Sequence, residues 1–138
     1  MLNARACTFL LLLPLLTTTD DHQLTKQDHD YTYLDMVLQW PPGACFNFSY
    51  CREKIPSTWV VHGLWPSVNY TSFPTNCNTC SDLDLDSLPH KLVKQMKKQW
   101  PDFYQGTDGT EKLWKHEYCK HGTCCEDVLA SPADYFQV

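Results

Sequence analysis

The 138-residue sequence is defined first by what it lacks. After residue 16 it has no apolar run near the roughly 20 residues that a transmembrane helix needs, which argues against an integral membrane protein. It has no internal repeats. Its length corresponds to one domain at most. It also lacks a net positive charge: the formal value of −5 gives no overall argument for a nucleic-acid partner.

The N-terminus has the layout of a secretory signal peptide. Residues 1–5 carry one positive charge, residues 6–16 are a Leu-rich apolar run, and residues 17–21 are polar. The apolar run is too short to span a bilayer as a helix. We therefore expect residues 1–19 to be a signal peptide and residues 20–138 to form one exported domain, with no membrane association once the signal is removed.

The cysteines agree with export. Cys7 leaves with the signal, and the seven that remain are Cys45, Cys51, Cys77, Cys80, Cys119, Cys124 and Cys125. In an oxidising compartment most of these would form disulfides, and an odd number leaves at least one without a partner in this chain. The sequons that begin at Asn47 and Asn69 are candidate glycosylation sites.

Two strands and two helices are predicted. Residues 33–40 and 58–64 are rich in β-branched and aromatic residues and suit strands, with His62 near the end of the second one, beside a loop. An amphipathic helix is indicated by apolar residues that recur every three or four positions, namely Leu85, Leu88, Leu92, Met96 and Trp100. Ser87 is its predicted N-cap.

The second predicted helix covers residues 111–121 and ends at Gly122, and residues 133–138 begin a further element. On a helix the residues His116, Glu117, Lys120 and His121 lie within an arc of about 140° and can line one side of a cleft.

Histidine can both give and take protons near neutral pH. Two histidines in opposite protonation states are what a phosphodiester with a neighbouring 2′-hydroxyl needs: one takes the hydroxyl proton and the other protonates the leaving 5′-oxygen. A cation beside the phosphorus balances the charge that develops there. This chemistry requires no metal. His22, His29 and His90 are assigned to ordinary packing.

A zinc site is the alternative chemistry for these residues. The protease pattern H-E-x-x-H places its histidines four residues apart, whereas His116 and His121 are five apart. The pair Cys77 and Cys80 is not followed by a standard zinc-finger spacing. No metal or other cofactor is expected, although a metal-binding module that uses Cys77, Cys80, Cys119 and His121 remains a competing hypothesis.

Both histidine segments resemble the active-site segments of the ribonuclease T2 family. They read His62-Gly63-Leu64-Trp65-Pro66 and His116-Glu117-Tyr118-Cys119-Lys120-His121-Gly122-Thr123-Cys124, and the segment Leu38-Gln39-Trp40-Pro41 resembles the opening strand of the family. The resemblance implies an α+β fold, an antiparallel sheet packed with helices. Family members continue well past residues 135–136, so we expect the C-terminal part of that domain to be missing here.

The resemblance also implies roles for the residues. His121 would be the general base on the 2′-hydroxyl and His62 the general acid. Glu117 and Lys120 would stabilise the pentacoordinate transition state, and His116 would hold the phosphate.

Trp65, together with Phe73, would stack on a base, which suits a low-specificity enzyme on single-stranded RNA. By resemblance, the product is a 2′,3′-cyclic phosphate and the working pH is acidic. The implied partner is single-stranded RNA and not DNA, for a monomer that is secreted or, alternatively, lysosomal.

The resemblance further suggests the disulfides Cys45–Cys51 and Cys77–Cys124. Cys80, Cys119 and Cys125 are left over, and a Cys80–Cys119 pair is conceivable. A hypothesis from another class is a catalytically silent, truncated secreted protein that acts by binding and is stabilised by its disulfides.

Overall fold

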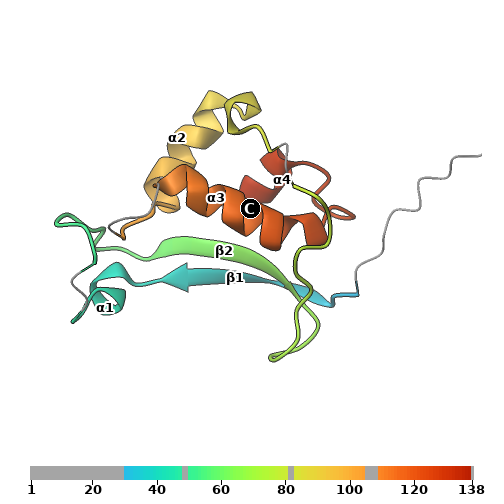
Figure 1. Cartoon of the computed structure of the whole chain (residues 1–138), viewed down its shortest axis with the longest axis horizontal. Helices are drawn as coiled ribbons and strands as arrows, with labels where there is room; N and C mark the ends of the chain where they lie inside the picture. The colour runs from blue at the N-terminus through green and yellow to red at the C-terminus, as the bar shows by residue number, and fades with distance from the viewer. Residues whose placement is uncertain (1–29, 48–49, 81–82, 105–108, 138) are drawn as a thin grey trace, which may run out of the picture.

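The computed structural model describes residues 30–47, 50–80, 83–104 and 109–137. The predicted signal peptide lies outside them. The elements are β1 (Tyr33–Gln39), α1 (Pro41–Ala44), β2 (Val60–Ser67), α2 (His90–Gln99), α3 (Thr110–Lys120) and α4 (Pro132–Phe136), with 3-10 turns at Leu85–Ser87 and Gly122–Cys124. The strands form an antiparallel pair, and α2, α3 and α4 lie on one side of it (Figure 1). The predicted α+β class is confirmed.

The register of the two strands contains a β-bulge at His62. Val37 pairs with Gly63 and Leu38 pairs with Val61, so His62 is the extra residue of β2. The strand was predicted to end at residue 64, but it continues through Pro66 to Ser67, which places His62 near its beginning. An edge strand tolerates proline because one side of its backbone needs no ladder partner, and among the described residues β2 pairs with β1 alone.

The predicted N-cap of the first long helix is wrong. Ser87 closes a 3-10 turn, where its hydroxyl donates to the Asp84 carbonyl at 2.7 Å, and α2 begins only at His90. Leu88 has an extended backbone (ψ 146°) because the proline that follows it disfavours helical geometry. The apolar face is nevertheless as predicted, with Leu92 and Met96 buried.

Helix α3 lies within one residue of its predicted bounds. It begins after Gly109, whose φ of 94° is a conformation that suits glycine. The predicted stop at Gly122 has a different cause from the one expected, because Gly122 has no positive φ and continues into the 3-10 turn. A Cβ atom at Gly122 would press on the Tyr118 ring and approach the Tyr135 ring, so the glycine permits close packing.

The hydrophobic core lies between β2 and the helices. Its largest buried members are Trp100, Trp114, Tyr118, Tyr135 and Phe136. The short helix α4 is the element predicted to begin near residue 133. Its Tyr135 hydroxyl donates to the Leu64 carbonyl at 2.9 Å and so ties α4 to β2. Within the described ranges, no helix combines the length and apolar character that crossing a membrane requires.

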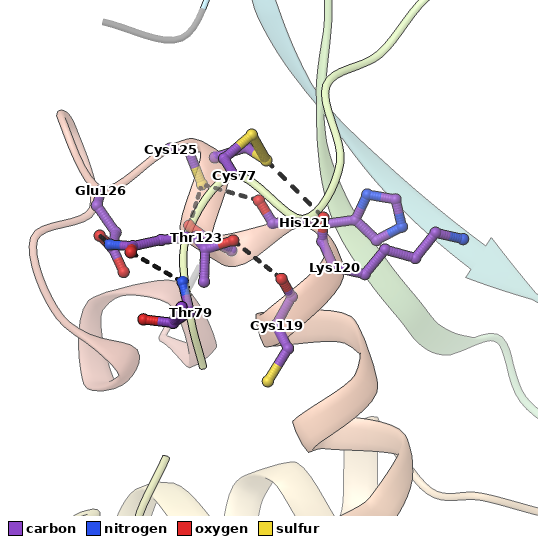
Figure 2. Close-up of a disulfide and its surroundings, with 11 residues drawn as sticks. Cys77, Thr79, Cys119, Lys120, His121, Thr123, Cys125 and Glu126 are labelled. Carbon is purple, nitrogen blue, oxygen red and sulfur yellow. Dashed lines mark hydrogen bonds between the residues drawn. A yellow bond between two sulfur atoms is a disulfide. The ribbon is translucent and has the colours of Figure 1, made fainter. Parts of the chain in front are cut away.

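Three disulfides are present in the part of the chain that the structure describes. The two pairs that the family resemblance suggested, Cys45–Cys51 and Cys77–Cys124, both form, and Cys80 pairs with Cys119. Cys125 is a buried free thiol whose pKa is raised to about 12, mainly by burial. Figure 2 shows the end of α3 beside the Cys77 disulfide, with the side chains of Lys120 and His121 reaching away from it.

Candidate active site

The two histidine segments meet at Glu117. Its Oε1 lies 3.7 Å from His62 Nε2, and its Oε2 accepts a hydrogen bond from Trp65 Nε1 at 2.8 Å. Glu117 is only 1% exposed, and buried polar groups need partners. The partners of this carboxylate come from the opposite segment. Gly63 permits the approach, because a Cβ atom there would collide with the Glu117 carboxylate and the Trp65 indole. The glycine beside His62 is thus required by side-chain packing.

His121 is held between aromatic rings. The Trp65 ring stacks on the imidazole with centroids 4.8 Å apart and 20° between the planes, and Phe73 lies 6.2 Å away. His121 is 1% exposed, and among the described residues neither ring nitrogen has a hydrogen-bond partner. Burial, followed by the positive charges of Lys120, His116 and His62, lowers the His121 pKa to about 4. The imidazole is therefore neutral and able to accept a proton at mildly acidic pH.

His62 lies in a more open position than His121. Its side chain is 27% exposed and borders a cleft of about 270 Å³, which is also lined by Lys112 and His116. His116 itself is exposed and Lys120 is half-buried. On α3, Glu117 therefore turns inward while His116 faces the cleft, so the four residues of the predicted arc do not all line one side of that cleft.

All five predicted catalytic residues lie within the described part of the chain, and electrostatic or direct contacts connect them. Glu117 contacts His62, while His62, His116 and Lys120 each act on the charge of His121. The predicted stacking residues Trp65 and Phe73 lie 6.1 Å apart, centroid to centroid. The structure thus brings the predicted set together around two chemically different histidines.

The competing metal-binding hypothesis fails because its three cysteines are not available as metal ligands. Cys77, Cys80 and Cys119 are all consumed in disulfides. In the part of the chain that the structure describes, no group of three or more His, Cys, Asp or Glu side chains is arranged to hold a metal ion.

Both sequon asparagines are exposed. The Asn69 Oδ1 accepts hydrogen bonds from the Thr71 backbone N–H at 2.9 Å and the Thr71 hydroxyl at 3.0 Å, within a turn. Asn47 has a φ of 78°, and the two residues after it lie outside the described ranges.

Two features of the site were missed by the sequence reasoning. One is the bulge that makes His62 the extra residue of β2, and the other is a hydrogen bond from Trp100 Nε1 to the His62 carbonyl at 2.8 Å. A glycine inside a strand pattern is a known signal of a bulge or a close approach, so Gly63 could have indicated the first. No sequence pattern indicates the second.

Comparisons with known proteins agree with this geometry. The Ribonuclease T2 family model matches residues 31–138. Extracellular ribonuclease LE of Solanum lycopersicum is 32% identical over 133 residues, which cover 94% of this chain and 57% of that protein. Ribonuclease T2 of Homo sapiens is 33% identical over 129 residues, or 91% and 48% of the two chains.

Among solved structures, RNase NT in complex with 5′-AMP superposes with a TM-score of 0.67 at 32% identity, covering 78% of this chain and 53% of that one. The chain thus spans about half the length of the relatives it matches. The match over residues 31–138 includes both histidine segments and the strand and helix that carry them, and the chain belongs to the ribonuclease T2 family.

Proposed function

We propose that this chain carries the catalytic segments of an endoribonuclease that cleaves single-stranded RNA by transphosphorylation. The observation that carries the proposal is the contrast between two histidines: His121 is buried with a pKa lowered to about 4, and His62 is open to the cleft beside a carboxylate. A base that stays neutral and an acid that is solvent-accessible are the two partners that this reaction needs.

The proposed step begins at the 2′-hydroxyl. A nitrogen of His121 removes the hydroxyl proton while the 2′-oxygen forms a bond to phosphorus. The bond from phosphorus to the 5′-oxygen breaks, and His62 gives its proton to that leaving oxygen. The products are a 2′,3′-cyclic phosphate and a free 5′-hydroxyl, and the two histidines have exchanged protonation states.

The other groups of the site would support this transfer. Lys120 supplies positive charge beside the phosphorane, and His116 holds the phosphate from the cleft side. The buried Glu117 carboxylate is within 3.7 Å of His62 and pairs with its protonated form, which would keep the acid in place as charge develops on the phosphorus. Together these groups would stabilise the pentacoordinate transition state.

Base binding would engage the aromatic cluster. Trp65 and Phe73 cover His121, so an RNA 2′-hydroxyl can reach the imidazole only after one of these rings shifts. Stacking of a base on Trp65 or Phe73 provides the energy for that shift and tolerates any base, because every base has a flat face. DNA, which has no 2′-hydroxyl, would not be cleaved.

The context proposed for this activity is an exported, glycosylated monomer, secreted or lysosomal. The disulfides favour an oxidising compartment, and one of the relatives is named an extracellular ribonuclease. Glycosylation would fall at the exposed Asn47 and Asn69.

The test is cleavage of a labelled single-stranded RNA oligonucleotide at pH 5 with a chelator present. We expect the parent chain to release products ending in a 2′,3′-cyclic phosphate, and His62→Ala and His121→Ala to lose nearly all of this rate. His90→Ala, on an exposed position of α2, is the matched control and should match the parent. Cleavage that survives both site substitutions overturns the proposal, and RNA binding without cleavage by the parent favours the silent binding protein instead.

A further inference from the structure

Trp100 contacts the site but has no part in the proposed reaction. It follows the last residue of α2, is 4% exposed, and donates its indole N–H to the backbone carbonyl of His62 at 2.8 Å. The contact joins residues 38 positions apart in the sequence. Because the acceptor is the main-chain carbonyl of His62, the hydrogen bond acts on the backbone from which the side chain extends and not on the imidazole ring itself.

The bulge explains why this carbonyl needs a partner. The extra residue of a β-bulge is left out of the ladder, and its backbone can turn more freely than that of a paired residue. Because the peptide group is planar, a fixed carbonyl also fixes the neighbouring backbone atoms. The hydrogen bond from Trp100 therefore gives the His62 carbonyl a fixed partner in the bulge, where His62 Nε2 lies 3.7 Å from Glu117 Oε1.

Trp100 is itself held from the opposite segment. Trp114 Nε1 donates to the Trp100 carbonyl at 2.8 Å, and Trp114 lies on α3, two residues before His116. Tyr135 and Phe136 of α4 pack on the Trp100 ring, with centroids 6.0 and 5.5 Å away. Two successive indole hydrogen bonds thus connect α3, the end of α2 and the bulge in β2.

We propose that Trp100 is a positioning residue for His62, and that the Trp114–Trp100–His62 chain of hydrogen bonds sets the general acid at its working distance from α3. The proposal rests on the proposed function for the role of His62. A displacement of a catalytic group by about 1 Å can lower a rate on the order of 100-fold, which is the scale on which such positioning acts.

The first experiment substitutes Trp100→Phe, which keeps an aromatic ring against Tyr135 and Phe136 and removes the donor together with part of the buried indole. We expect the NMR signals of the His62 imidazole to shift while those of His90, at the other end of α2 from Trp100, stay in place. In the RNA assay kcat falls by about 10-fold to 100-fold, with KM changed by less than about twofold. Trp59→Phe is the matched control, since Trp59 is 63% exposed, and it should change neither readout.

A second measurement needs no substitution and covers the case in which Trp100→Phe fails to fold. In the unmodified chain the indole N–H of Trp100 should exchange with solvent far more slowly than that of the exposed Trp59. Trp114→Phe, which removes the hydrogen bond to the Trp100 carbonyl, should speed that exchange and move the His62 signals in the same direction as Trp100→Phe.

The outcomes separate this inference from the proposed function. Exchange at Trp100 as fast as at Trp59, or unchanged His62 signals and kcat in a folded Trp100→Phe variant, overturns the positioning role. Cleavage that survives both His62→Ala and His121→Ala overturns the proposed function alone, because the His62 imidazole signals of the parent and Trp100→Phe still report whether Trp100 positions the residue.

Discussion

The indole of Trp65 serves two partners at once: its face stacks on the His121 ring at 4.8 Å, and its N–H donates to Glu117 Oε2 at 2.8 Å. One side chain of β2 therefore contacts both the proposed base and the buried carboxylate on the opposite segment. A change at this position can separate the stacking contact from the hydrogen bond.

Trp65→Phe keeps a ring over His121 and removes the donor to Glu117. A buried carboxylate that loses a hydrogen bond destabilises the fold by about 1.5–3 kcal/mol, so we expect a loss of that size in the free energy of unfolding, measured by urea denaturation at pH 7. The partner variant Glu117→Gln should make the loss at Trp65 smaller in a double-mutant cycle. Fully additive losses would show that the negative charge of Glu117 adds nothing to this hydrogen bond, since the amide oxygen of glutamine can still accept it.

Gly63→Ala tests the close approach of the two segments. The added methyl group meets the Glu117 carboxylate and the Trp65 indole, both of which are held by packing. We expect a destabilisation of about 1–3 kcal/mol. The matched control is Gly43→Ala, where the methyl group approaches only the half-exposed Trp40 ring and the thermal midpoint should fall much less. Equal shifts in the two variants would contradict the packing argument.

The lowered pKa of His121 predicts a loss of stability in acid. The unfolded chain binds a proton at His121 near pH 6.5, whereas the folded chain binds it only near pH 4, so stability falls as pH drops between these values. The difference corresponds to at most about 3 kcal/mol. Urea titrations at pH 7 and pH 4 should give a smaller difference for His121→Phe than for the parent. His90→Ala should retain the dependence of the parent, and a parent-like dependence in His121→Phe would exclude His121 as the cause.

The disulfides should differ in how much they contribute to the free energy of unfolding. Cys77–Cys124 spans 47 positions and Cys45–Cys51 spans six, and a longer closed loop loses more entropy in the unfolded chain. Cys80–Cys119 lies inside the loop that Cys77–Cys124 closes, so the comparison is made in a variant that lacks the Cys80–Cys119 bridge. In that variant, replacing both cysteines of the first pair with serine should destabilise the protein by about 4 kcal/mol, against about 2 kcal/mol for the second pair. Thermal denaturation of the two double variants compares them directly, and the reverse order would show that the unfolded-chain argument does not apply.

Much of this architecture could be predicted because its causes are local. Helix α3 follows from an uninterrupted segment between glycines, and the buried face of α2 follows from its apolar period. The start of α2 was misplaced because Pro89 acts on Leu88, which a capping pattern alone does not reveal. Two of the disulfide pairs came from the family resemblance and the Cys80–Cys119 pair was left open, since sequence alone does not determine connectivity.

The residues that form the site could be predicted from the sequence, but their arrangement in space could not. The set of five catalytic candidates follows from two motifs, but the burial of His121 depends on Trp65 and Phe73, which lie far from it in the chain. The bulge at His62 depends on the register with β1, and its support depends on Trp100. Such long-range contacts leave no periodic trace in the sequence.

The hydrogen bonds of the Tyr135 hydroxyl join segments that are far apart in the sequence, and this separation bears on the order in which the site forms. The hydroxyl bonds the Leu64 carbonyl, 71 positions earlier, and lies 3.4 Å from the carbonyl oxygen of Glu117. Every residue proposed for chemistry precedes this tyrosine in the sequence. The hydrogen bonds of Tyr135 that join the two histidine segments therefore form only after α4, which follows both segments in the chain, has packed against β2.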